Sequence, residues 1–207
     1  MLAGDRGREH CREDAKFLYE AGADALIVQD RGLARLIQEH APDVARHAST
    51  QMTIHTLDAA KQARDIGCSR VVLSRECSRE EIKLITEQAG VETEVFVHGA
   101  LCMCYSGQCY LSAVIGQRSG NRGLCAQPCR LPYSGGYPLS LKDLMLAGHV
   151  AALSDWGVSS LTIEGRMKRP AYAAIVTKVY SALLRQHRRP TAAERALPRR
   201  RFRRAGL

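Results

Sequence analysis

The chain has 207 residues, of which 45% are hydrophobic and 25% charged, with 30 Lys and Arg against 21 Asp and Glu. This length suggests one domain of ordinary size or part of a larger one, and the composition excludes a wholly disordered or fibrous chain. No apolar run approaches the roughly 20 residues that cross a bilayer, and residues 1–6 lack the apolar core of a secretory signal. We therefore expect a cytoplasmic protein without a membrane span.

The formal net charge of +9 is concentrated at the carboxyl end of the chain. Residues 185–207 hold nine arginines and one acid, so residues 1–184 are nearly neutral. The arginine run at 199–204, close to Pro190 and Pro198, predicts a disordered basic tail. Such a tail can contact RNA phosphates, or it is simply a solvated terminus, because basic tails are common and unspecific.

Short runs rich in β-branched residues alternate with longer stretches that have apolar residues at helical spacing. In chain order the sequence predicts a helix over 9–22, strands over 25–28 and 44–47, a helix over 57–66, a strand over 71–73, a helix over 79–89, strands over 95–97 and 137–141, a helix over 143–155, a strand over 161–163 and a helix over 171–185. Glycines at 22, 67, 90 and 157 stand where four of these helices should end.

This alternation predicts an α/β fold with a parallel sheet and right-handed crossovers. A closed TIM-like barrel needs eight strands, and the sequence offers six. The chain is therefore expected to form either an open sheet or, as we favour, a TIM-barrel-like sheet that lacks its first strands.

Polar residues follow nearly every predicted strand. They are Gln29 and Asp30, then His47, Ser49 and Gln51, then Arg75 and Glu76, then His98, then Lys142 and Asp143, then Glu164 and Arg166. Loops are polar in any protein, but six such ends in succession favour an active site at the carboxyl rim of the sheet.

Individual roles can be assigned to several of these rim residues. His47 and His98 are candidates for proton transfer because histidine titrates near neutral pH, although each can equally be bonded to a neighbouring loop. Arg75, Arg166 and the nearby Lys168 are candidates for binding an acidic co-substrate. Glu164 either takes part in catalysis or forms a structural ion pair with Arg166. We also assign Gln51 and Glu76 to the substrate-binding rim.

The alternation breaks between residues 99 and 136, where five of the eight cysteines fall within 28 residues. They are Cys102, Cys104, Cys109, Cys125 and Cys129. Cysteines this dense in a cytoplasmic chain usually bind metal rather than form disulfides. The spacing leaves an iron–sulfur cluster, zinc and unligated thiols all open. The isolated Cys11, Cys68 and Cys77 are expected to be small buried hydrophobes.

The cysteine-rich block resembles the signature of peptidase family U32, the collagenase-like proteases. The resemblance is carried by EVFVHGALCMCYSGQCYLS at 94–112 and RSGNRGLCAQPCR at 118–130, flanked by HASTQM at 47–52 and LTIEGRMK at 161–168. It covers about residues 15–184. It implies a partial TIM-barrel-like catalytic domain over 1–184, with the cysteine-rich metal loop at 99–136, followed by the basic tail at 185–207.

The resemblance also implies one of two activities. One is proteolysis of collagen-like substrates. The other is oxygen-independent hydroxylation of RNA or of a small aromatic ring by relatives that hold a [4Fe-4S] cluster, among which the tRNA branch uses prephenate as its hydroxyl source. Carried onto this chain, the cluster ligands are Cys102, Cys109, Cys125 and Cys129, with Cys104 as an extra candidate. We expect the hydroxylating activity, with RNA or an aromatic ring as substrate and an acidic co-substrate.

Two departures from the family pattern bear on activity. Relatives usually have one or more strands before the block that begins here, so the barrel looks truncated at its amino end. Many relatives also have a cysteine after the SLKDL segment, where this chain has Met145. If that cysteine is a ligand in the relatives, this chain would either hold its cluster poorly or use Cys129 in its place.

Two alternative functions stay open. A thiol peptidase would pair Cys104 or Cys109 with His98, since the sequence has neither a G-x-S-x-G elbow nor an H-E-x-x-H helix. An inactive family member would keep the metal-binding loop after losing part of its barrel, and the low strand count motivates this reading.

Overall fold

The computed structural model describes residues 8–187, with side chains described from residue 13 onward. Within this range the helices are α1 (Arg8–Glu20), α2 (Arg31–His40), α3 (Leu57–Asp65), α4 (Arg79–Gln88), α5 (Leu111–Gly116), α6 (Val150–Asp155) and α7 (Pro170–His187). The strands are β1 (Ala25–Val28), β2 (Ala45–Ala48), β3 (Arg70–Val72), β4 (Glu92–Gly99), β5 (Leu144–Met145) and β6 (Ser160–Ile163). Most of the sequence predicted to be a basic tail, residues 188–207, lies outside the described residues.

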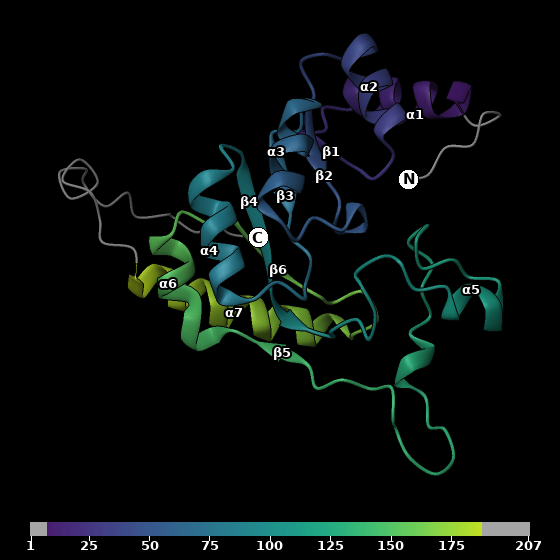
Figure 1. Cartoon of the computed structure of the whole chain (residues 1–207), viewed down its shortest axis with the longest axis vertical. Helices are drawn as coiled ribbons and strands as arrows, with labels where there is room; N and C mark the ends of the chain where they lie inside the picture. Colours follow the sequence, from purple (N-terminus) through teal and green to yellow (C-terminus); the bar gives the residue numbers. More distant parts are fainter. Residues whose placement is uncertain (1–7, 188–207) are drawn as a thin grey trace, which may run out of the picture.

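The six strands form one mostly parallel sheet that does not close into a barrel. Strands β1 to β4 pair in chain order, all parallel, and β6 pairs with β4, also parallel. The short β5 runs antiparallel and pairs with the last two residues of β4, His98 and Gly99. The predicted incomplete, TIM-barrel-like α/β sheet is therefore confirmed (Figure 1).

Most of the helices pack on the sheet through apolar side chains. The burial of β4 alternates residue by residue, with Val95 and Val97 buried. Residues from α2, α3, α4, α6 and α7 join these strand residues in a single core. Side chains at the starts of α2, α3 and α4 accept backbone N–H bonds, and Ser78 forms a capping box with Glu81 at the start of α4. The four predicted helix-ending glycines all have positive φ.

Two predicted elements are wrong. Residues 137–141 do not form a strand, because Pro138 cannot donate to a ladder, and Tyr137 and Leu141 are exposed instead. The helix expected over 143–155 begins only at Val150, since residues 144–145 form β5. The sheet is consequently not all parallel.

Candidate metal and anion site at the strand ends

The carboxyl ends of β2, β3, β4 and β6 border one pocket of about 280 Å³. The strand ends contribute Ser49, Gln51, Arg75, Glu164 and Arg166 among its lining residues. The opposite wall comes from residues 99–136, called the cysteine segment below. The predicted gathering of rim residues is thus present for four of the strands, with Gln51, Arg75, Glu164 and Arg166 in one pocket.

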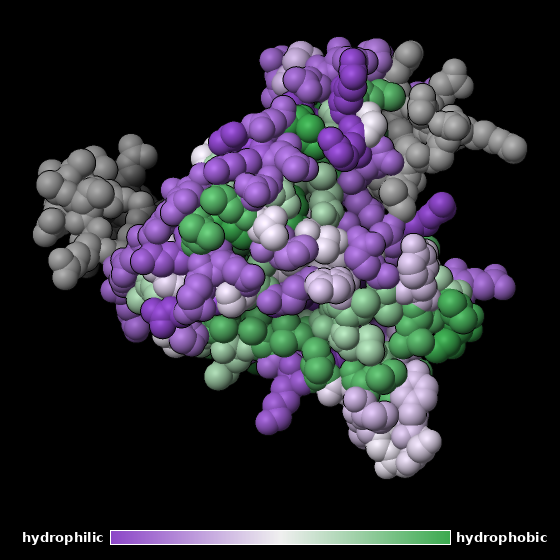
Figure 2. Space-filling view, in the orientation of Figure 1, coloured by the Kyte–Doolittle hydropathy of each residue, from purple (hydrophilic) through white to green (hydrophobic). Residues whose placement is uncertain are grey.

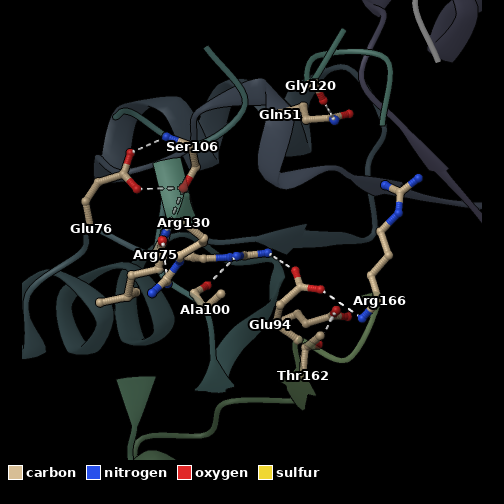
Figure 3. A network of polar contacts seen from close by, with 12 residues as sticks. Gln51, Arg75, Glu76, Glu94, Ala100, Ser106, Gly120, Arg130, Thr162 and Arg166 are labelled. Atoms are coloured by element: carbon tan, nitrogen blue, oxygen red, sulfur yellow. Dashed lines mark hydrogen bonds and ion pairs between the residues drawn. The ribbon is translucent and has the colours of Figure 1, made fainter. Parts of the chain in front are cut away.

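Ser106 joins the cysteine segment to the end of β3. Its backbone N–H and its hydroxyl both donate to the Glu76 carboxylate, at 3.0 and 2.7 Å (Figure 3). The hydroxyl oxygen also accepts the backbone N–H of Arg75 at 3.3 Å. Ser106 is only 2% exposed, so these bonds satisfy a polar group that burial would otherwise penalise. They fix the start of the segment, which carries Cys102, against the sheet.

A close backbone approach joins the segment to the residues after β2. A Cβ on Gly107, whose φ is +79°, would lie 2.7 Å from the Cα of Gln51, so only glycine fits there. The Gln51 amide donates to the carbonyl of Gly120 at 2.9 Å, as Figure 3 shows. Further along, Gln29 after β1 donates to Asn121 at 2.9 Å. Gln51 therefore holds two distant parts of the segment at the pocket wall.

Four of the five clustered cysteines are partly buried, whereas Cys104 is exposed. The four are Cys102, Cys109, Cys125 and Cys129. Three of them line the pocket, and Cys109 is the one that does not. Burial raises the pKa of the Cys129 thiol, Arg130 beside it acts in the opposite direction, and the other three thiols raise it further. Cys102, Cys109 and Cys125 are thus near enough to Cys129 to add to the upward shift of its pKa.

Backbone N–H groups point at two of the four sulfurs. The N–H of Leu111 donates to Cys109 Sγ at 3.4 Å, and the N–H of Gln127 donates to Cys125 Sγ at 3.3 Å. Such bonds orient thiolate ligands and stabilise their negative charge.

The chemical type of the available donor atoms, thiol sulfur, fits a thiolate-held cluster. Within residues 8–187, no three His, Cys, Asp or Glu side chains stand close enough together to hold a metal ion. Four soft thiols, three of them lining one pocket and two of them with N–H donors, nevertheless match in type the ligands of iron–sulfur clusters rather than those of oxygen-seeking ions. Met145, in β5, is 68% exposed and does not line the pocket, whereas Cys129 does.

The cations predicted to bind a co-substrate differ in what they contact, and Lys168 does not line the pocket. Arg75 contacts the Glu164 carboxylate at 2.6 Å, donates to the Ala100 carbonyl at 2.7 Å and lies over the Phe96 ring. Lys168 lies 3.4 Å from the Asp143 carboxylate. Within the described residues, Arg166 has no acidic partner, and its contact with Glu164 is made by its backbone N–H at 3.1 Å. Arg166 is thus the cation left free to bind a ligand.

Glu164 is held as a fixed anion. One of its carboxylate oxygens contacts Arg75 and the other accepts the backbone N–H of Arg166. The ion pair suggested by the sequence therefore forms with Arg75 rather than with the Arg166 side chain, since the short turn after β6 presents the Arg166 backbone to Glu164.

The two histidines expected to transfer protons do not line this pocket. His98 lies against α7, with its Nδ1 3.3 Å from the Tyr180 hydroxyl. His47 lies in β2 opposite Arg70 of β3, and burial followed by the Arg70 charge lowers its pKa.

Sequence reasoning missed two residues that shape the site. Ser106 bridges the segment to Glu76, and Arg130 contributes to the pocket wall while pairing with Asp143 at 3.1 Å. For Arg130 a signal existed, since it directly follows Cys129. For Ser106 the sequence offered no signal, because its partners Glu76 and Arg75 are about 30 residues away in the chain.

These features define a partial TIM-barrel-like protein with a thiol-lined, arginine-bearing pocket at its strand ends. A model of peptidase family U32 matches residues 1–204, and the chain belongs to that family. A solved U32 peptidase covers 81% of this chain and 65% of its own length with a TM-score of 0.51, at 16% identity, which supports the fold alone. No helix in residues 8–187 has the length and apolarity needed to cross a membrane.

Relatives with described activities fall into two groups. The chain is 42% identical over 178 residues to a 23S rRNA 5-hydroxycytidine synthase of Escherichia coli, covering 81% of this chain and 27% of that protein. It is 34% identical over 225 residues to tRNA hydroxylation protein P of the same organism, covering 81% and 50%. It is 31% identical over 207 residues to a collagenase of Porphyromonas gingivalis, covering 87% and 49%. The chain thus spans half or less of the length of these relatives.

Proposed function

We propose that this chain carries the catalytic site of an RNA-hydroxylating protein and holds a [4Fe-4S] cluster through Cys102, Cys109, Cys125 and Cys129. The observation that carries the proposal is a strand-end pocket lined by three of these thiols, those of Cys102, Cys125 and Cys129, together with an arginine that has no acidic partner among the described residues. The relatives named for rRNA and tRNA hydroxylation support the substrate class. An RNA substrate also agrees with the cytoplasmic location expected from the sequence.

The pocket residues would have different roles in binding and positioning the substrates. Arg166 would bind the acidic group of a co-substrate, because a guanidinium pairs bidentately with carboxylate and phosphate. Glu164, fixed by Arg75, would orient a donor group of the substrate rather than act as a free base. Gln51 would keep the cysteine segment closed over the strand ends. The bound cluster would supply electron transfer, and the four cysteine thiols would have to be deprotonated to hold it.

Zinc is the alternative occupant of the same thiols. A closed tetrahedral zinc site also uses four cysteines, but it is structural and supplies no electrons. Metal analysis distinguishes the two, because an iron–sulfur site contains acid-labile sulfide and a zinc site does not.

The peptidase alternative receives less support from the site. A thiol peptidase needs a cysteine within hydrogen-bond reach of a histidine. In the described part of the chain no hydrogen bond joins His98 to a cysteine, and its ring instead contacts Tyr172 and Tyr180 of α7.

The direct test is nucleoside analysis of RNA from a bacterial host that lacks its own RNA-hydroxylation genes and expresses this chain. We expect a pyrimidine nucleoside that has gained one oxygen atom, detected by mass spectrometry. Arg166→Gln should abolish or strongly reduce it, whereas the matched variant Lys168→Gln should keep most of it, because Lys168 already pairs with Asp143. Absence of any hydroxylated nucleoside with the unaltered chain would overturn the proposal.

A further inference from the structure

Residues 95–142 form a segment of 48 residues without a single Asp or Glu, called the acid-free segment below. The whole chain has 21 acids in 207 residues, so about five would be expected in a stretch of this length. The same segment contains Arg118, Arg122, Arg130 and Lys142. Its charge is therefore only positive, although residues 1–184 are nearly neutral as a whole.

Three tyrosines of the acid-free segment are turned to solvent. Tyr105 is 62% exposed, Tyr110 is 72% exposed and Tyr137 is 63% exposed. Among the described residues, none of the three hydroxyl groups has a hydrogen-bond partner, in contrast to Tyr133, whose hydroxyl donates to Pro128 at 2.9 Å. Large aromatic rings normally bury much of their area, so three exposed rings make this segment a candidate for binding a partner.

Two arginines of this segment also lack acidic partners. Arg118 and Arg122 are exposed, and within residues 8–187 neither contacts a carboxylate; Arg118 donates only to the Leu124 carbonyl at 3.0 Å. In Figure 1, α5 and the loop before β5 extend away from the sheet. In Figure 2 this extension carries many green and pale residues, whereas purple, hydrophilic residues predominate over α2 to α4. The extension is thus aromatic, apolar and basic.

The anionic thiolates of a bound cluster would explain why acids are absent close to the cysteines. They do not explain the exposed aromatic rings or the arginines without acidic partners. A nucleic acid would explain both features, because its bases stack on tyrosine rings and its phosphates bind arginine. Exposed Val114 and Ile115 on α5 would also suit a protein partner, and the experiment below separates the two cases.

We propose that the acid-free segment is the surface on which a single-stranded RNA is bound, with bases stacked on Tyr105, Tyr110 and Tyr137 and phosphates held by Arg118 and Arg122. This inference rests on the proposed function and adds to it where the RNA lies. The segment also contributes the thiols that line the pocket, so RNA bound here would lie on the same part of the chain as one wall of the strand-end site.

The test measures binding of a short fluorescein-labelled single-stranded RNA to the full chain by anisotropy at several salt concentrations. Each Tyr→Ala change at 105, 110 or 137 should weaken binding about 5- to 150-fold without changing the salt dependence. Each Tyr→Phe change at these positions should bind as the unaltered chain does, because stacking needs the ring and not the hydroxyl. Arg118→Gln and Arg122→Gln should each reduce the slope of log K against log salt by about 0.7.

Matched controls lie outside the acid-free segment. Tyr19→Ala in α1 and Arg31→Gln in α2 change exposed residues of the same types and should leave RNA binding unaltered. Equal weakening by these controls and by the segment variants would overturn the inference. So would tyrosine variants that bind RNA normally but change the oligomeric state in sedimentation, a result that identifies a protein interface.

Nucleoside analysis separates failure of this inference from failure of the proposed function. If the unaltered chain hydroxylates RNA and the three tyrosine variants still bind and hydroxylate normally, the binding surface is wrong and the function stands. If the unaltered chain binds RNA through these tyrosines but forms no hydroxylated nucleoside, the surface stands and the function is wrong. If it does neither, both are wrong.

Discussion

The sheet and the cysteine segment meet at one pocket but are held in place by different interactions. In the sheet, Val71 and Val97 have no exposed surface, and the helices bury a continuous apolar core against them. In the cysteine segment, Val114 is 80% exposed, and the contacts to the sheet are polar bonds made by Ser106, Gln51 and Gly120. The difference indicates that the sheet region is stabilised largely by apolar burial, whereas the segment depends more on specific polar bonds and on what its thiols hold.

The largest expected difference between the two regions is in thiol reactivity. Burial, followed by the nearby carboxylates of Glu81 and Glu76, raises the pKa of Cys77 from 9.0 to about 12, which lowers its thiolate fraction about a thousandfold. Cys104 in the segment is exposed. In metal-free protein, iodoacetamide should therefore modify Cys104 long before Cys77, as followed by peptide mass spectrometry. Equal labelling rates would mean that the sheet region opens as readily as the segment.

Apolar truncation should also affect the two regions unequally. Leu153 in α6 is 2% exposed, and Leu153→Ala should lower the free energy of unfolding by about 2–5 kcal/mol because it leaves a cavity. The matched change Leu131→Ala in the segment removes a side chain that is 54% exposed and should cost no more than about 0.5 kcal/mol. Urea unfolding midpoints measure both. A comparable loss for Leu131→Ala would show that the segment has an apolar core of its own.

Loss of one polar attachment should loosen the segment. Ser106→Ala removes a buried hydroxyl bonded to Glu76 and should destabilise the chain by about 1–3 kcal/mol, because the bond involves a charged partner. Limited proteolysis should show earlier cleavage within 99–136. Glu76→Gln keeps an acceptor and should have a smaller effect. Proteolysis of Ser106→Ala at the unaltered rate would show that this attachment does not hold the segment.

The smallest expected effect is a pH dependence that belongs to the sheet. Burial and then Arg70 lower the pKa of His47, while Glu94 and Glu92 oppose the shift. Because the unfolded chain binds this proton more readily, the contribution of neutral His47 is complete above its unfolded pKa of about 6.5 and is lost as the pH falls below it. Urea midpoints should therefore fall on acidification, and less so in His47→Gln. An identical pH profile for the variant would contradict this assignment.

The sequence was informative where a local pattern determines structure. Strand β1 was predicted with its observed bounds, and β4 and β6 were predicted within a few residues, because short β-branched runs end at turn residues. Residues 137–141 were wrongly predicted to be a strand because their side chains are mostly apolar. Pro138 cannot donate a hydrogen bond to a strand ladder. Helix α5 was missed because its six residues are too few to show a helical period.

The site was predictable in composition but not in pairing. The cysteines and the polar strand ends were visible as residue types, and the parallel topology brought four of those ends together. The sequence could not show which cation lacks an acidic partner. Arg75 pairs with Glu164, which is 89 residues away in the chain, and Lys168 pairs with Asp143, which is 25 residues away. Such partners are fixed by the fold and not by local spacing.

Metal analysis of the chain purified without oxygen decides whether Cys102, Cys109, Cys125 and Cys129 hold an iron–sulfur cluster. We expect about four iron atoms and four acid-labile sulfides per chain, retained in Cys104→Ser and lost from Cys129→Ser. Zinc without sulfide in the unaltered chain, or full iron content in Cys129→Ser, would contradict this expectation.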